Sequence, residues 1–197
     1  HSALYPIVKQ TRRAAGFDET DNACSQLDKL EASLHLAFDD VSDVAPLVAG
    51  LLSMNTESRY PVSHLRPEAL KEATLKALVS QFLAFSAKQP VLLIVEDAHW
   101  IDPTTQEVLD MLLPNIADKR VLAAITYRPE YRPRWSGLAY ALTLPVVRLP
   151  RRDVVLMTEK MVGGKPLARE VLEQIIAKTD GVPLFVEELT KTILESG

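Results

Sequence analysis

The chain has 197 residues and a formal net charge of −4, is 47% hydrophobic and 24% charged, and contains one cysteine, Cys24. These values suit one globular domain, or one domain with a small second piece, and they exclude an internal disulfide and a general affinity for nucleic acid. Nothing resembles a signal peptide, and no apolar run approaches the roughly 20 residues that span a bilayer, so we expect a cytoplasmic protein that contacts no membrane.

Helices are predicted for the first half of the chain. Residues 5–15 show an amphipathic pattern that ends near Gly16, and residues 25–54 again look helical. A turn-rich connection at 55–67 precedes a long helical pattern at 67–88, whose apolar residues populate one broad face. We expect this last helix to cover a sheet.

The most informative stretch runs from Pro90 to Leu112. Residues 91–95 are apolar without alternation and rich in β-branched side chains, which predicts a strand buried on both faces of a parallel sheet. Glu96 and Asp97 follow directly. They would lie at the carboxyl end of the strand, where open α/β sheets bind ligands.

A helix should begin soon after this strand. Asp102 is a good N-cap, Pro103 suits the first helical position, and the helix should extend to about Ala117, with Pro114 distorting or stopping it near its end. A second buried strand is predicted at 121–125. Strand, helix and strand then form a βαβ unit, which implies parallel pairing and a right-handed crossover.

The remainder of the chain changes from strands to helices. Trp135 lies in a loop-like segment and is expected to anchor packing, and a third short strand is predicted at 146–149. Three helical patterns then complete the chain. The predicted organisation is an α/β core at 1–150 and a small helical subdomain at 151–197.

The string EDAHWID, residues 96–102, closely resembles the segment after the Walker B strand of STAND-class AAA+ ATPases, the signal-transducing P-loop ATPases of large bacterial regulators. The resemblance is closest to the ATPase region beside class III adenylate/guanylate cyclase domains, and looser to LuxR-type transcription regulators. It implies an α/β fold in which a parallel P-loop NTPase sheet is flanked by helices and followed by a helical lid.

The resemblance also implies roles for residues at two strand ends. Glu96 and Asp97 would hold Mg²⁺ on ATP and polarise the attacking water, in an order that stays open; the alternative is a solvated acidic turn. Thr126 and Arg128 match the sensor 1 position, which faces the terminal phosphate. The alternative for Arg128 is an exposed side chain on a loop before Pro129.

A further match lies near the end of the chain. Gly181 and Pro183 correspond to the GxP motif, whose proline packs near the adenine base. The same two residues also fit a glycine just beyond a helix and a proline in the first turn of the next, so a structural role accounts for the spacing as well. Trp100 is expected to pack beneath the site rather than stack on the base, and Asp102 to cap a helix rather than bind a ligand.

The phosphate-binding loop itself is missing from the sequence. Gly163-Gly164-Lys165 is followed by Pro166 where Ser or Thr is required, and no G-x-x-x-x-G-K-[S/T] motif occurs. We therefore interpret the chain as a fragment, cut downstream of the P-loop, that alone binds ATP poorly and hardly hydrolyses it.

Two functions fit this interpretation. The first is a signalling ATPase that uses ATP and Mg²⁺ to control a covalently attached output domain, a nucleotide cyclase or a DNA-binding domain. The second is a non-catalytic interaction scaffold with a degenerate ATPase fold. A P-loop encoded before His1 would favour the first. Exposed sheet edges would in either case promote self-association or domain exchange. A metabolic α/β-hydrolase is disfavoured because no G-x-S-x-G elbow is present.

Overall fold

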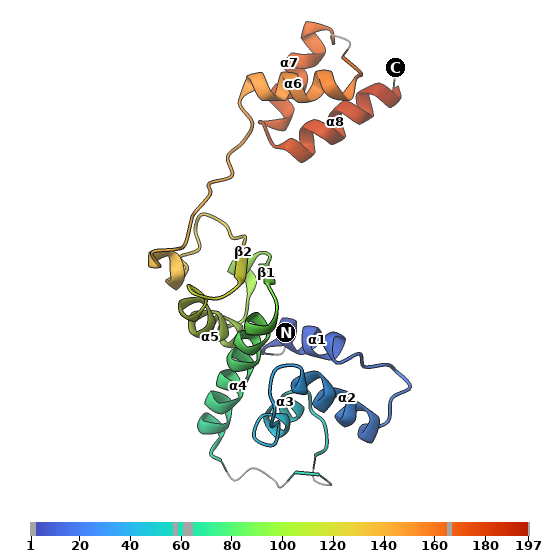
Figure 1. The fold of residues 1–197 in the computed structure, drawn as a ribbon. Coiled ribbons are helices and arrows are strands. Elements are labelled where there is room, and N and C mark those ends of the chain that lie inside the picture. The colour runs from blue at the N-terminus through green and yellow to red at the C-terminus, as the bar shows by residue number, and fades with distance from the viewer. Residues whose placement is uncertain (1–2, 57–58, 61–64, 165–166, 197) are drawn as a thin grey trace. The chain divides into compact units, whose positions relative to one another are not determined.

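The computed structural model describes residues 3–56, 59–60, 65–164 and 167–196 (Figure 1). Over these residues the protein is a mostly helical α/β protein with eight α-helices and one two-stranded parallel sheet. It forms two compact units, His1–Ala141 and Leu142–Gly197. The segment between residue 142 and the first helix of the predicted subdomain therefore belongs to the second unit.

The first unit contains all the strands of the described chain and five helices. In order, its elements are α1 (Tyr5–Ala14), α2 (Ala23–His35), α3 (Ala45–Leu51), α4 (Pro67–Lys88), β1 (Val91–Val95), α5 (Pro103–Leu112) and β2 (Val121–Ile125). Short 3₁₀ turns follow β1 (η1, Ala98–Trp100), α5 (η2, Leu113–Asn115) and β2 (η3, Arg134–Gly137).

The predicted helices at 5–15 and 67–88 and the two predicted strands are confirmed. The predicted helical stretch 25–54 is instead two helices, interrupted at 36–44. The carboxylate of Asp40 accepts a hydrogen bond from the backbone N–H of Ser42 at 2.9 Å within the interruption. Such local side-chain bonds compete with the helical ladder and favour turns.

The helix after β1 is shorter than predicted. It ends at Leu112 rather than near Ala117, and the 3₁₀ turn η2, which contains Pro114, follows directly. Proline removes a helical donor and its ring obstructs the preceding turn. The predicted effect of Pro114 is thus confirmed, and it acts earlier than expected.

Strands β1 and β2 pair in parallel, from Val91 opposite Val121 to Val95 opposite Ile125, with α5 in the connection. The prediction that both faces are buried is wrong. Alternate side chains Leu92 and Ile94 are each 60% exposed, because no described element covers that face of the sheet.

The opposite face of the sheet packs against the core of the first unit. This core joins α4 and α5 to the inward side chains of both strands, and Trp135, 8% exposed, lies within it as predicted. Its other buried members are Leu4, Leu75, Leu78, Val79, Val108, Leu109, Leu112, Leu113 and Ile116. Among the described residues, the sheet is therefore packed against helices on one face only.

A separate cluster holds α2 and α3 together. Leu30, Leu34 and Val48 in it are fully buried. The leucines of the predicted helical stretch 25–54 therefore form part of a packed core. The burial of each such side chain contributes about 1.5–3 kcal/mol relative to exposure.

The second unit is a three-helix arrangement of α6 (Arg151–Met161), α7 (Arg169–Thr179) and α8 (Pro183–Ser196) around Val154, Ile175 and Val186. The predicted third strand at 146–149 is wrong. These residues form no regular structure, and Val146 is 98% exposed. A strand needs a neighbouring ladder for its backbone groups, and the described chain supplies none here.

No helix among the described residues is long and apolar enough to cross a membrane.

Candidate functional site

The carboxyl ends of β1 and β2 are joined by three hydrogen bonds, two between backbone groups and one to a side chain. The N–H of Thr126 donates to the carbonyl of Val95 at 2.9 Å, and the N–H of Ala98 donates to the carbonyl of Thr126 at 2.8 Å. The N–H of Asp97 donates to the hydroxyl oxygen of Thr126 at 3.0 Å. The predicted acidic strand end and the predicted sensor strand end thus lie side by side.

Asp97 has a left-handed backbone conformation, with φ 52° and ψ 46°. This region is costly for most residues, but Asp and Asn tolerate it better than others. Its effect is to turn the chain sharply out of β1. The carboxylate of Asp97 remains 74% exposed, and Glu96 is exposed as well. Both predicted acids therefore face solvent at the end of the sheet.

The three consecutive side chains of the turn η1 differ strongly in burial. Ala98 is fully buried, the His99 side chain is 11% exposed and Trp100 is 74% exposed. The prediction that Trp100 packs beneath the site is wrong. The turn follows the left-handed Asp97, and within it His99 lies mostly buried whereas Trp100 faces solvent.

Trp100 and Arg128 face each other across the two strand ends. The guanidinium carbon of Arg128 lies 5.9 Å from the centroid of the Trp100 ring, within the range of a cation–π contact. No carboxylate of the described chain lies within ion-pair distance of Arg128. Sequence reasoning missed this pairing because the two residues follow different strands and are distant in the chain. The adjacency of the strand ends was predicted, but the direction of Trp100 was not.

His99 is also a feature that sequence reasoning did not single out. Both of its ring nitrogens are buried without a hydrogen-bond partner among the described residues, and Nδ1 lies 4.0 Å from a carboxylate oxygen of Asp97. Its ring contacts that of Trp100 at a centroid distance of 5.2 Å. His99 therefore lies in contact with both Asp97 and Trp100.

Asp102 is a helix cap, as predicted. Its carboxylate accepts the backbone N–H groups of Thr104 and Thr105, each at 3.0 Å, the hydroxyl of Thr105 at 2.5 Å and the N–H of Leu4 at 3.3 Å. Partial burial acts to raise the pKa of Asp102, but the hydrogen bonds from Thr105, Leu4 and Thr104 outweigh it and lower the pKa below its usual value. The carboxylate thus caps α5 and also binds the backbone N–H of Leu4, the residue before α1.

Gly181 and Pro183 belong to the second unit. Gly181 has φ +71°, and its carbonyl accepts the N–H of Leu149 at 2.7 Å. A Cβ at this position would overlap the backbone carbonyl of Leu149. Pro183 begins α8 and is exposed. The predicted structural role of Gly181 is therefore confirmed. Gly181 and Pro183 belong to the second unit, whereas the ends of β1 and β2 belong to the first.

The donor set at the strand ends suits one kind of metal. No group of three or more metal-ligating side chains occurs among the residues the structure describes, so a cage made of protein alone is absent there. Mg²⁺ is commonly held by one or two carboxylates together with waters and phosphate oxygens. Two exposed carboxylates, Glu96 and Asp97, fit that mode of binding.

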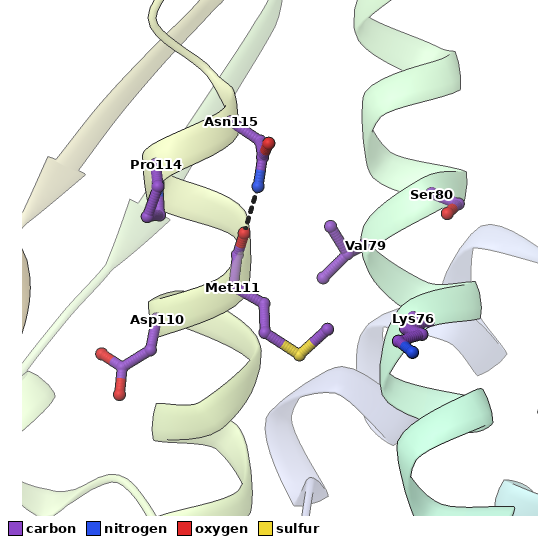
Figure 2. A pocket seen from close by; sticks show the side chains of 7 residues that line it. All are labelled: Lys76, Val79, Ser80, Asp110, Met111, Pro114 and Asn115. Carbon is purple, nitrogen blue, oxygen red and sulfur yellow. Dashed lines mark hydrogen bonds between the residues drawn. The ribbon is translucent and has the colours of Figure 1, made fainter.

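A shallow groove lies elsewhere, between α4 and α5. It has a volume of about 300 Å³, and Figure 2 shows Met111 extending toward Lys76 and Val79 while Asp110 points away. The side-chain amide of Asn115 donates to the carbonyl of Met111 at 2.8 Å. None of the predicted site residues lines this groove, and its one cation, Lys76, shares the lining with the carboxylate of Asp110, so we do not assign the site to it.

Comparison with known proteins adds little about function. No protein-family model matches the chain, and no solved structure matches it. The chain is 26% identical over 201 residues to "Uncharacterized protein R02095" of Rhizobium meliloti (strain 1021). The match covers 99% of this chain and 19% of that protein. The chain therefore spans about a fifth of the length of the curated relative that it matches.

Proposed function

We propose that the chain is part of a regulatory ATPase of the STAND type, in which ATP binding and slow hydrolysis control an attached output domain. The observation that carries the proposal is the hydrogen bond between Asp97 and Thr126, because it brings an acidic strand end next to a strand end that bears an arginine. Carboxylates for Mg²⁺ and a guanidinium for phosphate are the two kinds of group that phosphoryl transfer requires.

In this proposal Glu96 and Asp97 hold Mg²⁺ and orient the attacking water. The metal would neutralise charge on the phosphates as it develops. Their exposure, 74% for the side chain of Asp97, supports a site that is completed by a ligand rather than closed by the protein alone. The left-handed Asp97 also supports a functional role, since backbone strain of this kind clusters at ligand sites.

Arg128 is proposed to contact the terminal phosphate, beside the hydroxyl of Thr126. The guanidinium can bind two phosphate oxygens at once through its planar fork of donors. Without a carboxylate partner in the described chain, its donors are not neutralised by an internal ion pair. Gly181 and Pro183 are proposed to form a GxP motif, whose proline packs near the adenine base.

The missing P-loop is proposed to lie in a longer protein. Support comes from the relative in Rhizobium meliloti, of which the aligned region is only 19%. The uncovered sheet face with Leu92, Ile94 and Leu122 also supports additional elements, because exposed apolar surface of this kind is normally covered. The output domain would be a nucleotide cyclase or a DNA-binding domain.

The test is ATP turnover by the full-length protein with its own P-loop. Glu96→Gln and Asp97→Gly should each lower turnover at least tenfold, because each removes a carboxylate. Glycine is chosen at position 97 because it adopts positive φ without strain and so preserves the turn. Asp118→Asn removes an exposed carboxylate just before β2, at the other end of the sheet, and should leave turnover unchanged.

An interaction scaffold is the competing proposal, favoured by the same exposed apolar sheet face. The two proposals differ in one outcome. If the full-length wild type binds and hydrolyses no ATP, the ATPase proposal fails and the scaffold remains. Equal turnover in the wild type and in the doubly substituted protein, with Glu96→Gln and Asp97→Gly, would instead remove these two residues from the site.

A further inference from the structure

We propose that Trp100 is a positioning residue that holds the guanidinium of Arg128 at the strand ends, with its donors free to bind phosphate. The inference rests on the proposed function, because it adds Trp100 to the residues of the same site. It is carried by the 5.9 Å distance between the guanidinium carbon and the ring centroid.

An aromatic face is suited to this task for a physical reason. The N–H donors of a guanidinium lie in its plane, whereas the cation is attracted to a ring through its flat face. A carboxylate partner would instead occupy the fork of donors and compete with phosphate. Trp100 thus restrains Arg128 without consuming the hydrogen bonds on which phosphate binding depends.

The orientation of Trp100 is built into the turn that carries it. Asp97 adopts a left-handed conformation, Ala98 is fully buried, and His99 is mostly buried in contact with the Trp100 ring at 5.2 Å. These three neighbours fix the path of η1. Trp100 consequently projects from a restrained turn, although 74% of it is exposed.

The exposure of Trp100 also needs an explanation of its own. Tryptophan is highly buried on average, and Trp135 in the same unit is only 8% exposed. A contact with Arg128 at the end of the sheet gives the exposed ring a role that core packing does not. Because the ring would restrain one rotamer-rich side chain, its effect should appear in turnover more than in the affinity for ATP.

The contact is tested first by NMR on the 197-residue chain. Ring current from Trp100 should shift the side-chain signals of Arg128, and Trp100→Leu should abolish the shift. The signals of Arg134, which pairs with Asp110 at 3.2 Å, serve as the control and should not move. Arg128 signals that are the same in wild type and Trp100→Leu would overturn the proposal.

The role is tested by a double-mutant cycle in the full-length protein. Trp100→Leu should lower kcat for ATP about two- to fivefold, the effect of a cation–π contact at an exposed site, with a smaller change in KM. Trp100→Phe, which keeps an aromatic face, should recover most of kcat. In the Arg128→Ala background, Trp100→Leu should have no further effect, because nothing is left to position.

The outcomes separate the two proposals. Additive effects of Trp100→Leu and Arg128→Ala would overturn the positioning role while leaving the ATPase intact. Unchanged turnover in Arg128→Ala alone would refute the phosphate role of Arg128 and the positioning role with it, even if the NMR shift persists.

Discussion

The hydroxyl oxygen of Thr126 accepts the backbone N–H of Asp97 at 3.0 Å, so a side chain at the end of β2 satisfies the donor of the first left-handed residue beyond β1. The two strands are 29 residues apart in sequence at this point. The bond replaces the ladder hydrogen bond that the sharp turn at Asp97 removes. The bond therefore couples the conformation of the acidic end of β1 to that of the end of β2.

Substituting Thr126 should loosen this coupling. Thr126→Val removes the acceptor while keeping the shape, so the amide of Asp97 should exchange with solvent faster, and the free energy of unfolding should fall by about 0.5–1.5 kcal/mol. Amide hydrogen exchange and chemical denaturation measure the two effects. Thr126→Ser retains the hydroxyl and should exchange like the wild type; equally fast exchange in both variants would contradict the role of the bond.

Asp102 should contribute to stability through its cap. Asp102→Ala leaves the first N–H groups of α5 and the N–H of Leu4 without their acceptor and should lower the free energy of unfolding by about 1–2 kcal/mol. Thermal and denaturant unfolding measure this loss. Asp102→Asn keeps an acceptor oxygen and should cost less than Asp102→Ala.

The same residue should give stability a pH dependence. The pKa of Asp102 is lowered in the folded state, so the native state favours the ionised form more than the unfolded state does. This contribution is complete above the unfolded pKa near 4 and is lost as the pH falls through the lower folded pKa. Between pH 6 and pH 3, wild type should lose more stability than Asp102→Asn; identical pH profiles would contradict this assignment.

Gly181 should tolerate no side chain. Gly181→Ala introduces both a strained positive φ and an overlap with the carbonyl of Leu149, so it should lower the thermal stability of the second unit markedly. Gly163→Ala is the matched control, because Gly163 has φ +72° and open space around it. Gly163→Ala should therefore lower the free energy of unfolding only by the backbone strain, about 1–2 kcal/mol. Equal losses in the two variants would show that the overlap is relieved without cost.

Thr179 should be replaceable by valine. Its hydroxyl is buried without a hydrogen-bond partner among the described residues, so Thr179→Val removes an unsatisfied polar group and should be neutral or stabilise by up to about 1 kcal/mol. Thr158 is equally buried, but its hydroxyl donates to the carbonyl of Val154 at 2.7 Å. Thr158→Val should therefore be the less stable of the two by denaturation; the reverse order would show that Thr179 has a partner such as water.

Local patterns predicted the elements at the candidate site. The apolar runs gave both strands, and Asp102 with Pro103 gave the start of α5, because capping and strand propensity depend on a few neighbouring residues. Parallel pairing followed from a helix lying between two strands. The roles assigned to Glu96, Asp97, Thr126 and Arg128 stay predictions, because they depend on a nucleotide.

The sequence by itself determined where the strands end and which polar residues follow them, since short-range sterics and hydrogen bonding act within a few residues. Only the tertiary structure decided which face of the sheet is covered and that Trp100 points outward toward Arg128. It also decided that residues 146–149 form no strand. Burial and strand pairing depend on segments distant in the chain, and an apolar residue has the same local pattern whether or not a partner covers it.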